Sequence, residues 1–209
     1  RTTAGVYSVT LPSSNGCDST SNVTLIVNPL PVIDAGPNQT VCEGETVILN
    51  ATGAPAITWS PTQTNGVGFV QPVGSQIYTA TGTDANNCVN TDQVEIIVRP
   101  NPVVATVSPQ TRCNGTATAA VNFTSSVSGT TYTWTNDTPS IGLPSNGNGN
   151  INSFTATNTT SNPVTATITV TPTAAGCVGA PVSFTITVQP SPTATISGTT
   201  AVCIGGPSP

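Results

Sequence analysis

The sequence predicts an all-β fold, and three observations support this prediction. Polar and apolar residues alternate with a period of two, which is the period of a half-buried strand. Turn signals rich in Asn and Gly recur at short intervals: Asn15-Gly16, Asn65-Gly66, Asn114-Gly115 and residues 145–152. No window has the apolar spacing of a helix.

The clearest strand lies at residues 165–171, where threonines alternate with Ala166, Ile168 and Val170. We expect those three apolar side chains to face a core and the threonines to face solvent. Residues 94, 96 and 98 repeat the pattern. About seven short strands in 70–90 residues, with one Trp on a middle strand, are typical of an immunoglobulin-like β-sandwich.

Three segments of the chain share one plan, in which a strand, a turn ending in Cys, a second strand and a Pro-x-Pro step follow one another. The first two begin YSVTLPSSNGC at Tyr7 and YTATGTDANNC at Tyr78, with the cysteine ten residues later. The third runs from Thr165 and has Thr167 where the others have tyrosine. The plan therefore indicates tandem domains.

A second motif follows each Pro-x-Pro step and places Cys42, Cys113 and Cys203 each 11 residues after a proline. From both motifs we predict four segments: the C-terminal part of an immunoglobulin-like domain (1–29), two complete domains (30–99 and 100–189), and the N-terminal part of a further one (190–209). We expect a window on a longer array rather than a subunit whose half-domains complete those of neighbours. The proline steps favour extended backbone and predict a rod of end-to-end domains.

The charge content excludes several functions. The chain has 3 Lys or Arg, 8 Asp or Glu and no His, so 5% of its residues are charged, against about 25% on average. Without a basic patch we expect no nucleic-acid binding, and without histidine no Ser-His or Cys-His nucleophile pair and no imidazole metal site. No apolar run approaches the length of a membrane span, so we expect no membrane insertion. We predict a non-enzymatic extracellular protein with no catalytic, cofactor or metal site.

Six cysteines without histidine partners or a C-x2-C pair indicate disulfides in an oxidising compartment. The simplest pairing is one disulfide per complete domain, Cys42–Cys88 and Cys113–Cys177, each contributing about 3–4 kcal/mol by loop entropy. Cys17 and Cys203 would then pair outside the complete domains. In a sandwich, however, the turns that carry the two cysteines lie at opposite poles. This leaves a second pairing open, between neighbouring domains, with Cys42–Cys177 as its example, while one disulfide within each complete domain remains the first choice.

Other polar and aromatic residues are expected to be structural. Glu43 and Glu45 lie in a turn and are more consistent with solvation than with the carboxylate pair of a glycosidase. Asp34, Asp84 and Asp92 would be the calcium candidates, but the other complete domain has no acidic residues at the matching positions. The aromatic residues Trp59, Trp134, Tyr78 and Tyr132 are too few for a sugar-stacking platform, and we expect them to pack in cores.

Residues 35–49, 81–94 and 153–203 resemble the tandem immunoglobulin-like and PKD-like repeats of giant surface proteins from the Bacteroidota, including gliding-motility adhesins. The resemblance implies type IX secretion, attachment at the outer membrane and a role in adhesion or a surface filament. Asp18-Ser19-Thr20 matches the O-glycosylation pattern of that phylum, which makes Ser19 a candidate glycosylation site.

We therefore predict a structural segment of an extracellular repeat adhesin or cell-surface filament, acting as a stiff, disulfide-stabilised stalk. Its expected partners are neighbouring immunoglobulin-like domains of the same or adjacent chains, with surface glycans or other cells as further candidates. Two alternatives stay open: an accessory carbohydrate-binding array of a secreted enzyme, and a subunit that polymerises by strand complementation.

Overall fold

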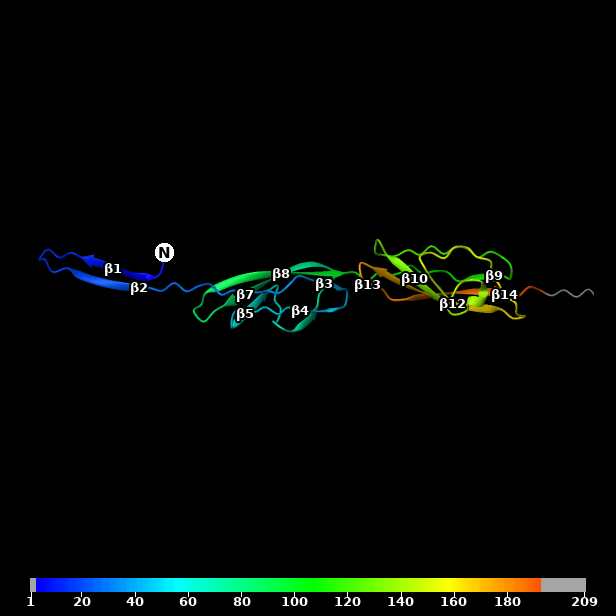
Figure 1. Cartoon of the computed structure of the whole chain (residues 1–209), viewed down its shortest axis with the longest axis horizontal. Coiled ribbons are helices and arrows are strands. Elements are labelled where there is room, and N and C mark those ends of the chain that lie inside the picture. Colours follow the sequence, from blue (N-terminus) through cyan, green and yellow to red (C-terminus); the bar gives the residue numbers. More distant parts are fainter. Residues whose placement is uncertain (1–2, 193–209) are drawn as a thin grey trace, which may run out of the picture. The chain divides into compact units, whose positions relative to one another are not determined.

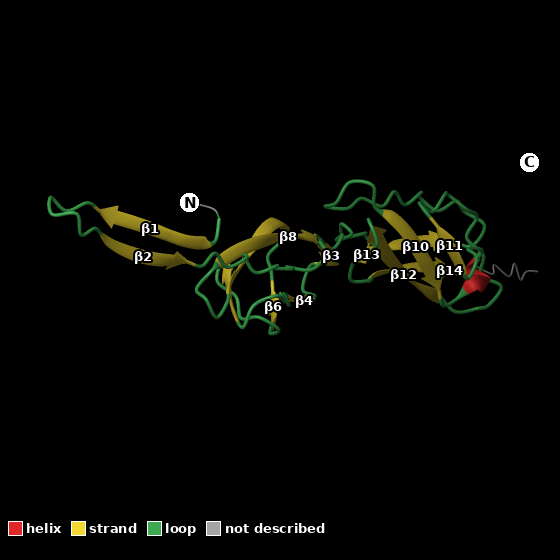
Figure 2. Cartoon of the chain, turned by 60° about the vertical axis from the view of Figure 1, so that its left-hand side comes forward, coloured by secondary structure: helices red, strands yellow, loops and turns green. Residues whose placement is uncertain are grey.

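The computed structural model describes residues 3–192 (Figure 1), and the chain divides into two compact units between Pro100 and Asn101. Strands and loops make up almost all of both units (Figure 2). Among the described residues the only helix is the three-residue 3₁₀ turn Pro139–Ile141, and no described helix is long and apolar enough to cross a membrane. The all-β prediction is confirmed.

The first unit begins with an antiparallel hairpin of β1 (Gly5–Leu11) and β2 (Ser19–Leu25), in which Tyr7 lies opposite Val23. The predicted Asn-Gly turn joins the two strands, and Gly16 has the positive φ of 77° that favours glycine. One face of the hairpin is apolar, yet Val23 on it is 63% exposed. The hairpin thus presents an uncovered apolar sheet face.

The rest of the first unit is a two-layer sandwich. One layer is the four-stranded sheet β3-β8-β7-β5, and the other is the pair β4-β6. The bounds are β3 (Gln39–Cys42), β4 (Thr46–Ile48), β5 (Ala56–Ser60), β6 (Gly68–Val70), β7 (Gly74–Thr83) and β8 (Val89–Arg99). The short first strand β3 runs parallel to the last strand β8, and all other pairs are antiparallel.

The second unit repeats this architecture with longer loops. Its sheet has the order β11-β10-β12-β14-β9, with β13 paired to β12. The bounds are β9 (Gln110–Cys113), β10 (Thr131–Asn136), β11 (Asn146–Asn148), β12 (Val164–Ala174), β13 (Cys177–Val178) and β14 (Val182–Gln189). Isolated bridges, such as Val121 to Ile151, hold the opposite layer together. The first strand β9 again runs parallel to the last strand β14.

The predicted strand faces are confirmed in both units. Ala166, Ile168 and Val170 are at most 1% exposed and belong to the core of the second unit, and residues 94, 96 and 98 are buried in the core of the first. Two details differ from expectation. Trp59 lies on β5, an edge strand of its sheet, whereas Trp134 lies on the interior strand β10. The Asn-rich stretch 145–152, expected to be a turn, contains the short strand β11.

Candidate functional site: cysteines at the ends of the strands

The cysteines differ in oxidation state. Cys42 and Cys177 are each disulfide-bonded, whereas Cys17, Cys88 and Cys113 are not bonded to any cysteine among the described residues. Cys203 lies outside the described residues. The simplest prediction, one disulfide within each complete domain, is therefore wrong for Cys88 and Cys113, and the strand register of each unit gives the reason.

In the first unit, Cys42 ends β3 and lies opposite Arg99, the last residue of β8. Cys88 immediately precedes Val89, the first residue of the same strand. The eleven residues of β8 separate the two cysteines, which at about 3.3 Å per residue is over 30 Å. A disulfide needs Cα atoms within about 7 Å, so Cys42 and Cys88 are out of reach of each other.

The second unit separates its cysteines in the same way. Cys113 ends β9 opposite Gln189, the last residue of β14. Cys177 lies opposite Ala174, the last residue of β12, and the other end of that long strand pairs with the end of β14. Cys113 and Cys177 therefore occupy opposite poles, about 30 Å or more apart by the rise of a strand.

Tight turns fix the cysteines at these poles. Cys177 follows a two-residue turn in which Ala175 and Gly176 have positive φ values of 49° and 88°, as in type I′ hairpins, and its side chain is buried. The Asp84 carboxylate accepts a hydrogen bond of 2.8 Å from the backbone N–H of Cys88. At the other end of the first unit, the Glu45 carboxylate accepts one of 2.8 Å from the N–H of Cys42.

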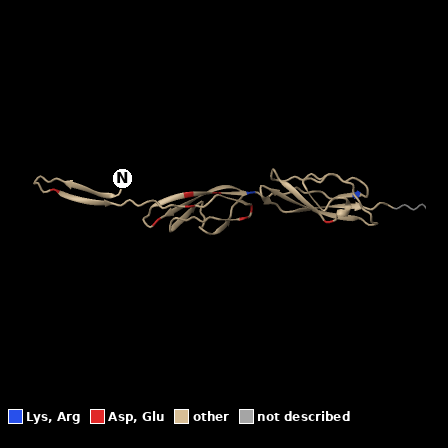
Figure 3. Cartoon of the chain, viewed as in Figure 1, with Lys and Arg blue, Asp and Glu red and all other residues tan. Residues whose placement is uncertain are grey.

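The remaining acidic candidates also bind backbone N–H groups. Asp34 accepts from Gly36 at 2.9 Å, and Asp92 accepts from Ala35 at 2.8 Å. The Ala35 N–H is the main cause that lowers the pKa of Asp92 below its ordinary value. Among residues 3–192, no group of three or more His, Cys, Asp or Glu side chains comes together as a metal site would require. The few charged side chains are scattered over the described chain (Figure 3).

Ser19, the candidate glycosylation residue, is exposed at the start of β2, opposite Leu11. The aromatic residues lie where the sequence predicted them: Trp59, Trp134 and Tyr78 are buried, and Tyr132 packs against the core of the second unit. The two tryptophans differ in the hydrogen bond of the indole N–H, and the sequence carries no signal for this difference.

The chain is similar to one protein-family model and to several solved structures. A family model described as a PKD-like domain matches residues 110–192, whereas no curated protein sequence matches the chain. Among solved structures, an E-to-A variant of three titin immunoglobulin domains is 13% identical, with 90% of this chain and 75% of that chain covered and a TM-score of 0.49. Cadherin domains 3–6 of protocadherin gamma B2 are 13% identical (91% and 59% covered, TM-score 0.39), and mouse cadherin-23 domains 22–24 are 14% identical (89% and 74% covered, TM-score 0.34).

By its strand topology, the chain is an all-β protein of immunoglobulin-like β-sandwich units, and residues 110–192 in the second unit match the PKD-like family model.

Proposed function

We propose that this chain is a structural segment of an extracellular repeat adhesin or cell-surface filament, in which tandem sandwich domains form a stiff, non-catalytic stalk. The observation that carries the proposal is the oxidation state of the cysteines: Cys42 and Cys177 are in disulfides although no cysteine of their own complete domain is within reach. A stalk under tension benefits from covalent links that lie between its domains rather than inside them.

The proposal includes a disulfide between Cys42 and Cys177. Cys42 lies at the end of the first unit where the chain leaves it, opposite Arg99. Cys177 lies at the end of the second unit where the chain enters it, because nearby Gly179 packs so closely on Pro102 that a Cβ atom would overlap the Pro102 carbonyl. Forming the bond removes two protons and two electrons from two thiols, and a disulfide-type oxidant of the exported environment accepts them.

The positions of Cys88 and Cys113 also suit disulfides between neighbouring domains. Cys88 lies at the pole of its sandwich where the chain enters it. Close to Cys88 in the chain, the Asn90 side chain donates a hydrogen bond to the Pro31 carbonyl at 2.9 Å. Cys113 lies at the exit pole of the second unit, opposite Gln189. We propose that each of these thiols bonds to a cysteine of an adjoining repeat, so that every junction carries one disulfide.

The cellular part of the proposal comes from the resemblance to Bacteroidota surface repeats. Export by the type IX route, adhesion and a glycan on Ser19 belong to it. Antibodies raised against residues 30–189 should label intact cells of the source organism, and shaving with an external protease should remove the label. Labelling that appears only after the cells are permeabilised would overturn an extracellular stalk.

A second candidate, polymerisation by strand complementation, is favoured by the exposed apolar face of the β1–β2 hairpin. The face contains Val9, Val23 and Leu25, and their counterparts in the complete domain, Ala80, Val94 and Ile96, are buried. On this alternative the purified chain sediments as fibres, and deleting residues 1–29 or 190–209 abolishes them. A monodisperse monomer at high concentration would exclude it.

A further inference from the structure

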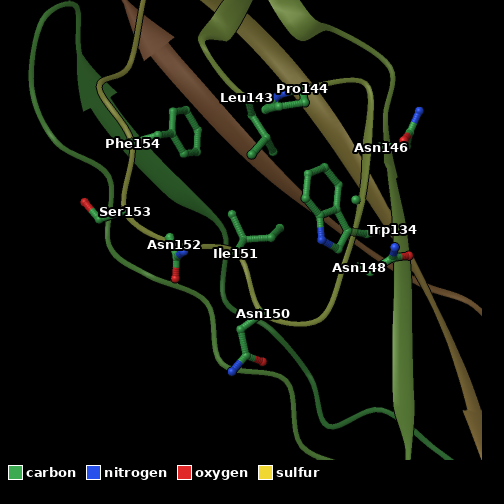
Figure 4. Close-up of a pocket in the computed structure, with 11 residues that line it drawn as sticks. Trp134, Leu143, Pro144, Asn146, Asn148, Asn150, Ile151, Asn152, Ser153 and Phe154 are labelled. Carbon is green, nitrogen blue, oxygen red and sulfur yellow. The ribbon is translucent and has the colours of Figure 1, made fainter.

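A groove of about 380 Å³ in the second unit lies over the ring of Trp134 (Figure 4). Its lining combines apolar side chains, among them Leu143 and Phe154, with a series of asparagines from residues 146–152. No lining side chain is charged. The volume is within the range of about 300–1,000 Å³ that is usual for small-molecule sites.

The indole N–H of Trp134 has no hydrogen-bond partner in the described structure. The side chain is 7% exposed and its Nε1 atom is buried, and Figure 4 shows this nitrogen on the side of the ring that faces Ile151. On the neighbouring strand, Gly147 lies opposite Trp134, and a Cβ atom there would overlap the ring. Buried indole N–H groups ordinarily find an acceptor. The Trp134 N–H is therefore an exception, because the described residues offer it none.

The first unit shows that the fold itself does not require an unpaired indole. Trp59 also lies on a strand and is also buried, but its Nε1–H donates to the Asn65 Oδ1 at 3.1 Å. The same oxygen accepts from the N–H of Ala51 at 2.8 Å. The missing acceptor is thus specific to the second unit, where the groove is.

Polar groups with unused hydrogen-bonding capacity surround the groove. The side chains of Asn148 and Asn152 line it (Figure 4), are exposed, and make no hydrogen bond to another described residue. Asn150 uses its Oδ1 to accept from the N–H of Phe123 at 2.9 Å, which leaves its amide donors available. Each free amide offers both a donor and an acceptor.

We propose that this groove binds one or two rings of a neutral saccharide. Sugar hydroxyls are donors and acceptors at once, which suits the free amides of Asn148 and Asn152, and the C–H face of a sugar ring suits Leu143 and Phe154. A sugar oxygen accepts a hydrogen bond from the Trp134 indole N–H. Because that N–H is shielded in the free chain, binding requires a small displacement of the lining residues. The neutral lining disfavours a charged ligand. This site is independent of the proposed stalk function.

Nuclear magnetic resonance of the ¹⁵N-labelled full chain tests the proposal, because its two tryptophans give two indole N–H signals. Trp134→Phe assigns them by removing one. Cellobiose, maltose, mannobiose and the disaccharide of N-acetylglucosamine are titrated separately. At least one should shift the Trp134 signal in a saturable way, while the Trp59 signal, already bonded inside its domain, stays unchanged.

Variants then locate the binding. Asn148→Ala and Asn152→Ala should each weaken it by about tenfold, the effect of one lost hydrogen bond. The matched control Asn162→Ala removes an exposed amide elsewhere in the same unit and should leave affinity unchanged. Three results would overturn the saccharide assignment: no disaccharide shifts the Trp134 signal, both indole signals move together, or triglycine shifts the Trp134 signal when no sugar does.

Discussion

Stretching the single chain from its two ends should reveal whether Cys42 and Cys177 are bonded to each other. In the oxidised chain, force would pass from residue 42 directly across the disulfide to residue 177. The residues between them would then not contribute to the extended length, even after both units had unfolded. After the bond is reduced, the residues between Cys42 and Cys177 contribute to the extended length.

The expected length follows from the sequence. The 135 residue steps from Cys42 to Cys177 correspond to about 470 Å of extended chain at about 3.5 Å per residue. Disulfides within the complete domains would instead shorten the extended chain by two separate lengths. The 46 steps from Cys42 to Cys88 and the 64 from Cys113 to Cys177 correspond to about 160 Å and 220 Å.

Atomic force microscopy on single chains, with and without reductant, measures these lengths. We expect the fully unfolded contour to grow by about 470 Å on reduction, and Cys42→Ser to show the long contour under both conditions. Cys88→Ser is the control and should behave like the parent chain. A contour that does not change on reduction, or that grows in the two shorter increments, would show that Cys42 and Cys177 are not bonded to each other.

Three further predictions concern local contacts. Asn65→Ala should lower the free energy of unfolding of the first unit by about 2–4 kcal/mol in urea denaturation, because it leaves the buried Trp59 N–H without an acceptor. Gly82→Ala should cost about 1–3 kcal/mol in the same assay, because its Cβ would overlap the Cδ1 of Ile33. Acid should destabilise the first unit below about pH 4, because folding lowers the pKa of Asp92. The resulting stabilisation is fully present above the pKa of the unfolded state and is lost as the pH falls through the pKa of the folded state.

Each of these predictions has a control. Asn86→Ala removes an exposed amide whose side chain makes no hydrogen bond, and Gly5→Ala adds a Cβ whose nearest neighbour is 3.9 Å away. Both should change unfolding by less than about 0.5 kcal/mol. Asp92→Asn should remove its share of the acid sensitivity in thermal melts at a series of pH values. An equally acid-sensitive variant would show that the Asp92–Ala35 hydrogen bond does not contribute.

The strands could be predicted from the sequence because burial repeats with the strand period. The alternation at Ala166, Ile168 and Val170 gave the buried face directly, and the shared plan at Tyr7 and Tyr78 predicted hairpins whose registers agree in the structure. Pairing of the cysteines was harder. Spacing gives the loop length but not the pole, and the pole depends on the parallel pairing of a short first strand with the last one, which involves residues far apart in the sequence.

The groove over Trp134 could not have been predicted in this way. The contexts ITWSP and YTWTN look alike. Only the side-chain positions show that Asn65 accepts the hydrogen bond of the first indole and that no acceptor among residues 3–192 reaches the second. The asparagines around the groove were expected to form a turn, because Asn and Gly favour turns wherever they cluster. Their free amides are a property of tertiary packing.

The most direct test of the proposed stalk is non-reducing peptide mapping by mass spectrometry of the protein isolated after export from cells. We predict a cross-linked peptide that contains Cys42 and Cys177, with Cys88 and Cys113 joined to peptides of adjoining repeats. Peptides that join Cys42 to Cys88 and Cys113 to Cys177, or free thiols at all of these positions, would contradict it.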